Sequence, residues 1–150
     1  MRIEKRNIIL FTAEFPYGEQ ETFLENEISY LGSSFKVQII PLFGNDKNLR
    51  DYSDLCEVLP SVMDSRNTSL KILICSLSKI MFWKVLFSGL LEFRYSKKGI
   101  VKLLKQCVAL SQLKSYLNNH SQVFNSDLWY FYWGTNSVNI LPFIKKMPPC

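Results

Sequence analysis

Three glutamates follow the first apolar segment of this 150-residue chain, at a point where a strand is expected to give way to a helix. The segment "NIILFTA" (7–13) ends in the turn "EFPYG" (14–18), and Glu19, Glu21 and Glu25 come next. A glycine in such a turn lets the backbone come close to a ligand, and the free N–H groups of a helix start suit a phosphate. Acidic side chains in the same place also stabilise a helix through its dipole, without any ligand. Both interpretations remain open.

A second polar group, "WGTNS" (133–137), follows the aromatic run "DLWYFYW" (127–133). A turn followed by a helix N-cap accounts for these residues. The functional alternative is contact of their polar side chains with a sugar or a phosphate. Four rings of the run could stack on a sugar, those of Trp129, Tyr130, Tyr132 and Trp133. Because alternate residues of a buried strand face the core, some of these rings must pack inside.

Metal and nucleophile chemistry find little support in the chain. The single histidine, His120, lies in "LNNHSQ", which is typical of a helix end or a loop. The four cysteines match neither a zinc spacing nor a CxxC motif: Cys56, Cys75, Cys107 and Cys150. The turn after 7–13 is neither a Gly-x-Gly-x-x-Gly fingerprint nor a Walker loop. We therefore expect no metal, no cofactor and no nucleophile–base pair, and the scattered thiols indicate a reducing, cytoplasmic compartment.

Composition limits the classes of partner. Hydrophobic residues make up 47% of the chain and charged residues 21%, as in a globular protein. The net charge of +5 is compatible with an anionic membrane surface or a phosphorylated ligand. No RNA- or DNA-binding motif is present, so we expect no nucleic-acid partner.

The apolar segment 70–93 is too interrupted by charge to cross a membrane. Its longest uncharged runs have seven residues, whereas a spanning helix needs about 20. Two interpretations remain, a largely buried helix and a basic helix on the membrane surface. The second is favoured by a group of basic residues that would face the membrane: Lys84, Arg94, Lys97 and Lys98. It would make the protein peripheral on the inner face of the plasma membrane.

The order of apolar and polar segments predicts an α/β fold. We expect strands at 7–13, 35–43, 56–60 and 127–133, and helices at 20–31, 69–93, 99–118 and 136–146. Gly32 would end the first helix. The order β-α-β-β-α-α-β-α is that of a Rossmann-like half with a parallel sheet, flanking helices and right-handed crossovers.

The segment "FPYGEQETFLENEISYL" (15–31) resembles the N-terminal motif of family 4 retaining glycosyltransferases of the GT-B fold. The resemblance is greatest to members from bacterial exopolysaccharide, O-antigen (lipopolysaccharide) and colanic-acid clusters. The matching elements are Phe15-Pro16, Glu21-Thr22-Phe23 and Glu27-Ile28. The later segment "FYWGTNSVNILPFIKK" (131–146) resembles the aromatic-Trp-Gly strand end of the same family.

The resemblance implies a two-domain enzyme that moves a sugar from a nucleotide-sugar to a lipid-linked or saccharide acceptor. The N-terminal half would bind the acceptor and the C-terminal half the donor. The loop that would face the donor phosphates contains Tyr17, Gly18, Glu19 and Glu21. The acceptor side would contain Trp133, Gly134, Thr135 and Asn136.

The chain also departs from the family, because the paired glutamates, the Arg/Lys pair and the catalytic-region histidine are not found in it. We therefore expect 1–150 to be a single, incomplete acceptor-side domain, to lack the nucleotide-sugar domain and to be inactive alone. Two alternatives remain. One is a non-catalytic Rossmann-like binding or scaffold protein, and the other is a peripheral membrane protein that binds through 70–102.

Overall fold

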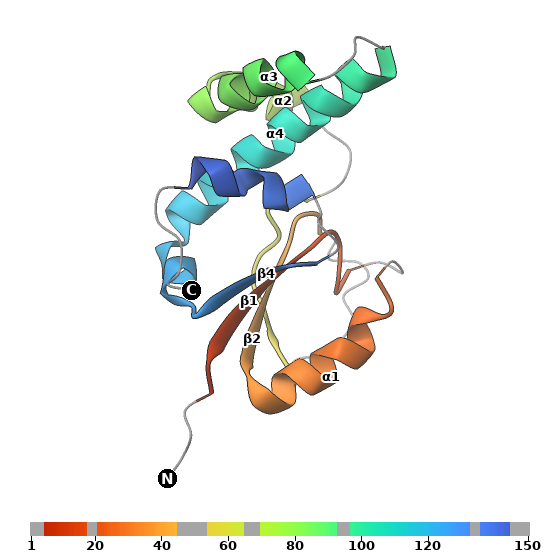
Figure 1. The fold of residues 1–150 in the computed structure, drawn as a ribbon, viewed down its shortest axis with the longest axis vertical. Coiled ribbons are helices and arrows are strands. Elements are labelled where there is room, and N and C mark those ends of the chain that lie inside the picture. Colours follow the sequence, from red (N-terminus) through yellow and green to blue (C-terminus); the bar gives the residue numbers. More distant parts are fainter. Residues whose placement is uncertain are drawn as a thin grey trace.

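The computed structural model describes residues 5–17, 21–44, 54–64, 70–92, 97–132 and 136–144. Its four strands form one sheet in the order β3-β2-β1-β4, and every pair in the sheet is parallel (Figure 1). The strands are β1 (Asn7–Thr12), β2 (Lys36–Pro41), β3 (Glu57–Val58) and β4 (Leu128–Phe131). The prediction of a Rossmann-like α/β fold with a parallel sheet is confirmed.

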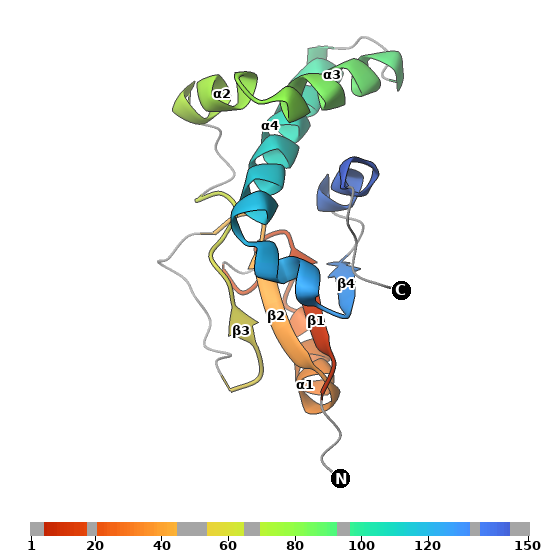
Figure 2. The ribbon, with the colours of Figure 1, turned by 90° about the vertical axis from the view of Figure 1, so that its left-hand side faces the viewer.

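Helices cover both faces of the sheet. They are α1 (Leu24–Ser34), α2 (Leu70–Leu77), α3 (Ile80–Glu92) and α4 (Lys97–Asn119), with the 3₁₀ helices η2 (Ser121–Asn125) and η4 (Asn136–Phe143). Helix α1 lies on one face, and α4 and η4 lie on the other. Figure 2 shows that α2 and α3 lie away from the sheet, beyond the carboxyl ends of the strands.

The alternating side chains of β1 supply two separate cores. Leu10 packs with Leu24 and Ile28 of α1. Ile9 and Phe11 point the other way, into the larger cluster under α4. All three β1 side chains are buried, which explains why the strand is a continuous apolar run rather than an alternating one.

Helix α1 differs from its prediction at both ends. It begins at Leu24 rather than at residue 20, and it continues through Gly32 to Ser34. A Cβ atom on Gly32 would lie 2.7 Å from the carbonyl oxygen of Leu55. The glycine therefore permits close approach of the helix to the chain that leads into β3. Its predicted role as a helix stop was wrong.

The single helix expected at 69–93 is two helices, broken at Ser78 and Lys79. Side chains donate hydrogen bonds to the carbonyl groups that are left without helical partners at the break. The Ser78 hydroxyl donates to the Cys75 carbonyl (2.9 Å), and the Trp83 indole N–H donates to the Leu77 carbonyl (2.9 Å). Such partners are what a helix end needs, so they stabilise the break.

A polar chain of contacts ties this break to α4. The Lys79 ammonium donates to the Gln112 amide oxygen, and the Gln112 amide N–H donates to the Ser76 hydroxyl, each at 3.0 Å. Ser76 is fully buried, and burial lowers the pKa of the Lys79 ammonium. The contacts fix α2 and α3 to α4 at one point.

The α-helix expected at 136–146 is the 3₁₀ helix η4, which contains Pro142. Proline has no N–H to donate and crowds the preceding turn, which disfavours a continuous α-helix here. Ile140 and Ile144 are still buried in the cluster under α4. The segment therefore covers the sheet as expected, with a tighter backbone.

Candidate functional site

The strands that precede the two predicted polar groups are neighbours in the sheet. β1 lies between β2 and β4, and Phe11 is paired with Phe131 near the carboxyl ends of both strands. The chain continues from β1 to β2 on one side of β1, and β4 pairs with the other side of β1. In open α/β sheets ligands bind outside the carboxyl ends of the strands at such a point. The candidate site is therefore the carboxyl edge of the sheet at β1 and β4.

The carboxylate of Glu21 closes the turn after β1. It accepts hydrogen bonds from three consecutive backbone N–H groups, those of Ala13 (3.2 Å), Glu14 (2.9 Å) and Phe15 (2.9 Å). Consecutive N–H groups of this kind form a small anion-binding concavity. Here the chain's own carboxylate fills it, so any other anion that binds these three groups must displace Glu21.

The backbone of Glu21 supports the same arrangement. Its φ of 61° lies in the left-handed region, which is uncommon for a residue other than glycine. The residue precedes α1, whose first turn contains Glu25 and Glu27 instead. The interpretation as a dipole partner therefore applies to Glu25 and not to Glu21. The carboxylate of Glu21 holds the strand end and the helix start together.

Tyr17 lies toward the β2 side of this edge. The chain reaches it through a cis Phe15–Pro16 peptide bond. A Cβ on Gly44 would lie 3.2 Å from the Tyr17 ring and would clash with Ser61, so these three residues pack closely. Gly44 follows β2 and Ser61 follows β3. Both were missed in the sequence, where the only signal was the glycine at the end of "PLFG".

Tyr132 connects the end of β4 to the start of α1. Its ring stacks on that of Phe23 with centroids 5.2 Å apart, and its hydroxyl lies 3.4 Å from a Glu27 carboxylate oxygen. The side chain of Tyr132 is buried, whereas Tyr130 is exposed. The Trp129 indole N–H donates to the Val123 carbonyl at 3.1 Å. Of the residues Trp129, Tyr130 and Tyr132, Tyr130 is the exposed one.

Several predicted site residues lie outside the described part of the chain. They are Gly18, Glu19, Arg94, Trp133, Gly134 and Thr135. Asn136 begins η4, and its side chain is also outside the description. Lys84 on α3 and Lys97 and Lys98 on α4 are exposed.

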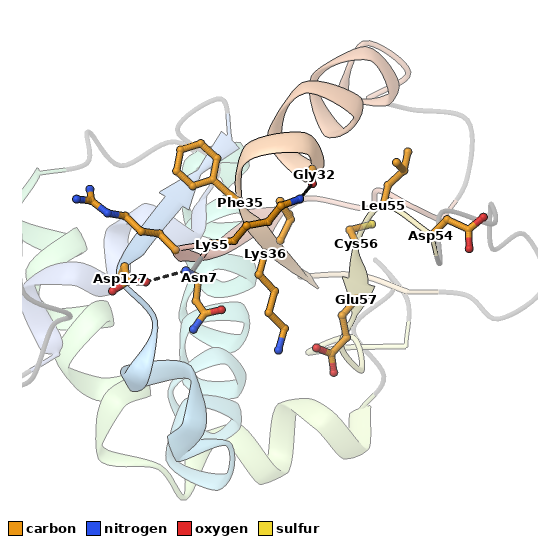
Figure 3. A pocket seen from close by; sticks show the side chains of 12 residues that line it. Lys5, Asn7, Gly32, Phe35, Lys36, Asp54, Leu55, Cys56, Glu57 and Asp127 are labelled. Atoms are coloured by element: carbon orange, nitrogen blue, oxygen red, sulfur yellow. Dashed lines mark hydrogen bonds between the residues drawn. The ribbon is translucent and has the colours of Figure 1, made fainter. Parts of the chain in front are cut away.

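A cavity of about 900 Å³ lies at the opposite, amino edge of the sheet (Figure 3). Two of its charged groups have protein partners: Lys5 donates to the Gly32 carbonyl and Asp127 accepts from the Asn7 N–H, each at 2.7 Å. Burial raises the pKa of the Cys56 thiol in its wall to about 11, so this thiol is a poor nucleophile at neutral pH.

The lone histidine has a structural position at the end of α4. The His120 ring stacks on Tyr116 with centroids 4.1 Å apart, and its Nδ1 lies 3.0 Å from the Tyr116 carbonyl oxygen. Among the described residues, no group of three or more His, Cys, Asp or Glu side chains could hold a metal ion. None of the described helices is long and apolar enough to cross a membrane.

Comparison with known proteins adds no family to this description. No family model, curated protein or solved structure matches the chain. A proposal of function must therefore rest on the sheet order, the contacts at the strand ends and the sequence motifs.

Proposed function

We propose that the chain is the acceptor-side domain of a GT-B retaining glycosyltransferase of cell-surface polysaccharide synthesis. One observation carries the proposal. Phe23 of the first motif stacks on Tyr132 of the second, although the two motifs lie far apart in the sequence. Both motifs thus reach the edge of the sheet at which α/β proteins bind ligands.

The contact of Glu21 with the strand end explains why the residues of the first motif occur together. The glutamate of Glu21-Thr22-Phe23 binds the N–H of Phe15, which belongs to the Phe-Pro pair of the same motif. The motif is therefore a unit that shapes the loop after β1. In the proposed enzyme this loop faces the donor phosphates, and the segment after Tyr132 faces the acceptor.

In the reaction, a hydroxyl of the lipid-linked or saccharide acceptor forms a bond to the anomeric carbon of the donor sugar. The bond from that carbon to the nucleoside diphosphate breaks, and the configuration is retained. The resemblance assigns the donor site to a second domain. The role of 1–150 is then to bind and orient the acceptor.

Calorimetric titration tests this division of labour. Residues 1–150 are titrated with a water-soluble, short-chain prenyl-diphosphate-linked sugar and, separately, with a panel of nucleotide-sugars. We expect heat of binding from the lipid-linked sugar. We expect no sugar transfer when the lipid-linked sugar and a nucleotide-sugar are both present. Absence of acceptor binding across a panel of such sugars, or steady turnover by 1–150 alone, would contradict the proposal.

The alternative is a non-catalytic Rossmann-like binding protein. It is favoured by Glu21, whose carboxylate already fills the N–H groups at the carboxyl end of β1. This alternative predicts no heat from saccharide acceptors in the same titration.

A further inference from the structure

Helices α2 and α3 each carry a stripe of exposed apolar side chains. On α2 the stripe is Leu70, Ile74 and Leu77, at the spacing of one helix face. On α3 it is Ile80, Trp83 and Phe87. The exposed fractions reach 71% at Leu70 and 75% at Ile80. We call these six residues the α2–α3 surface.

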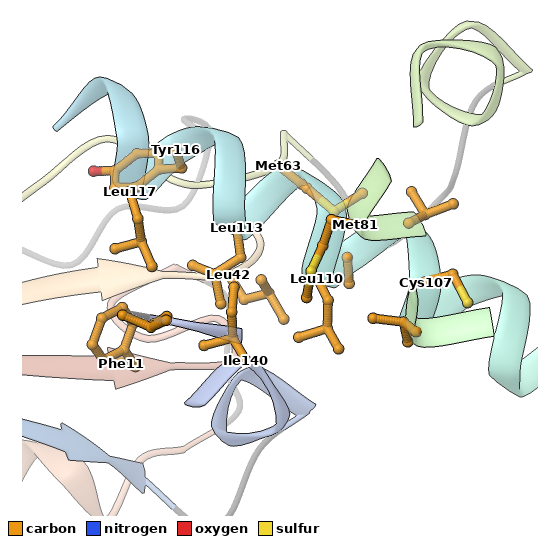
Figure 4. Close-up of a cluster of buried hydrophobic side chains, with 14 of the residues drawn as sticks. Phe11, Leu42, Met63, Met81, Cys107, Leu110, Leu113, Tyr116, Leu117 and Ile140 are labelled. Atoms are coloured by element: carbon orange, nitrogen blue, oxygen red, sulfur yellow. The ribbon is translucent and has the colours of Figure 1, made fainter. Parts of the chain in front are cut away.

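The exposed stripe of α3 lies opposite its buried one. Phe82, Val85 and Gly89 face α4, and a Cβ on Gly89 would clash with the Leu103 side chain. Figure 4 shows Met81 of the same helix beside Met63 in this core. Burial against α4 therefore explains only one face. One face of α3 is buried as in a core helix, and the opposite face is exposed.

The two stripes are joined. The Trp83 indole N–H donates to the carbonyl of Leu77, the last residue of α2. The Trp83 ring also lies beside Phe87, with centroids 6.3 Å apart. The Trp83 side chain thus connects the two stripes at the break between the helices. Exposed apolar surface of this extent on a soluble domain commonly marks an interaction site.

The charge around this surface is strongly positive. Residues 70–119 contain nine of the 18 Lys and Arg residues of the chain and one of its 13 acidic residues. The exposed lysines on these helices are Lys71, Lys84, Lys97, Lys98, Lys102 and Lys105. The rest of the chain has a net negative charge, so the basic character is concentrated at this end of the molecule.

We propose that the α2–α3 surface docks on an anionic phospholipid membrane. The apolar side chains enter the interface, and the lysines contact the lipid phosphates. The Trp83 ring can enter the interface without leaving its N–H unpaired, because that N–H already donates to the Leu77 carbonyl. A nucleic acid would not bury the apolar stripes, and a second copy would bring two positive surfaces together. The inference goes beyond the proposed function and stands without it.

Docking in this way also sets the orientation of the sheet. Helices α2 and α3 lie beyond the carboxyl ends of the strands, as Figure 2 shows. The membrane would then be on the same end of the molecule as Tyr17 and Tyr132. This consequence rests on the proposed function, in which that edge receives a lipid-linked acceptor.

Vesicle co-sedimentation tests the docking. Residues 1–150 are mixed at low salt with phosphatidylcholine vesicles, with and without phosphatidylglycerol. We expect binding to the anionic vesicles that weakens as salt is added. The affinity of the triple variant Ile74→Gln, Ile80→Gln, Phe87→Gln should fall at least about tenfold, because apolar burial is lost. The charge variant Lys84→Gln, Lys97→Gln, Lys98→Gln should show a weaker salt dependence, because it removes three of the six exposed lysines.

Matched controls lie at the other end of the molecule. Tyr30→Gln on α1 removes a ring that is 80% exposed, and Lys36→Gln removes an exposed charge on β2. Both should leave binding unchanged, and circular dichroism checks that every variant is folded. Equal binding by the triple variant and wild type, or no binding of wild type at low salt, would overturn the proposal.

Fluorescence distinguishes insertion from adsorption by charge. Brominated acyl chains quench a tryptophan that enters the bilayer interface. We expect quenching of the wild type and loss of the quenched component in Trp83→Phe. Quenching that persists unchanged in Trp83→Phe would show that another tryptophan enters the bilayer, and it would overturn docking through the α2–α3 surface. Sedimentation velocity tests for self-association through the same surface. Dimers of the wild type that are lost in the triple variant, together with no vesicle binding, would also overturn the proposal.

Discussion

The carboxylate of Glu21 accepts a hydrogen bond of 2.9 Å from the backbone N–H of Phe15. The same carboxylate also binds the N–H groups of Ala13 and Glu14. One side chain thus ties the start of α1 to the end of β1. This contact holds the backbone of residues 13–15 at the candidate site.

Replacement of Glu21 by glutamine should destabilise the fold. The variant keeps the size of the side chain but turns one acceptor oxygen into an N–H₂ group that faces backbone donors. The expected loss is about 1–3 kcal/mol in the free energy of unfolding. Urea denaturation measures it. Glu57→Gln is the control, since its exposed carboxylate accepts one bond from Gln38, and it should change stability by about 0.5 kcal/mol or less.

Replacement of Gly32 by alanine should also destabilise the fold, although alanine favours helix. The new Cβ would lie 2.7 Å from the Leu55 carbonyl oxygen, and backbone must move to relieve the contact. Overpacking costs about 1–3 kcal/mol, against a gain of about 1 kcal/mol in helix propensity. Thermal denaturation should show a lower Tm than for Ser33→Ala, an exposed neighbour. A higher Tm for Gly32→Ala would contradict the close approach.

The cysteines should differ sharply in reactivity. Cys75 is exposed, whereas Cys56 and Cys107 are buried, and burial raises the pKa of each buried thiol to about 11. Iodoacetamide at pH 8 should therefore label Cys75 first, with Cys56 and Cys107 labelled only after denaturation. Peptide mapping by mass spectrometry identifies the sites. Rapid labelling of Cys107 in the folded chain would contradict its burial.

The same two thiols should make stability depend on alkaline pH. Their ordinary pKa is 9.0, so above pH 9 the unfolded chain loses protons that the folded chain retains. The free energy of unfolding should fall as pH rises from about 9 through about 11. The variant Cys56→Ala, Cys107→Ala is less stable overall but should show a shallower fall over that range. An unchanged slope would assign the effect to other groups.

Removal of the Gln112 side chain should loosen the junction of α2 and α3. Gln112→Ala takes a partner from Lys79 and from the buried Ser76 at once. The expected cost is about 1–2 kcal/mol, with faster amide hydrogen exchange in 70–77. Gln106→Ala, on the same helix, is the control and should leave that exchange unchanged.

Much of the sheet could be predicted because its two central strands, β1 and β2, are mostly buried. The segments predicted at 7–13 and 35–43 match β1 to within one residue and β2 to within two residues at each end. The helix between them follows from the spacing of Leu24 and Ile28, both buried. Local pattern was enough here because burial and periodicity agree.

Contacts between distant segments could not be predicted in the same way. No stop signal marks the break at Ser78, and the partner that holds it, Gln112, lies more than 30 residues away. Gly32 resembled a helix stop because its contact with Leu55 depends on where β3 lies. At the candidate site, Gly44 and Ser61 approach Tyr17 only through the order of the strands.

An NMR titration tests the central claim most directly. Amide shifts of ¹⁵N-labelled 1–150 are followed while the short-chain prenyl-diphosphate-linked sugar is added. The account predicts shifts that cluster at the carboxyl edge, in 13–17 and 132–136. It predicts little change at the amino edge, at Asn7, Glu57 and Asp127. Shifts confined to the amino edge, or none at either edge at saturating sugar, would contradict an acceptor site at the ends of β1 and β4.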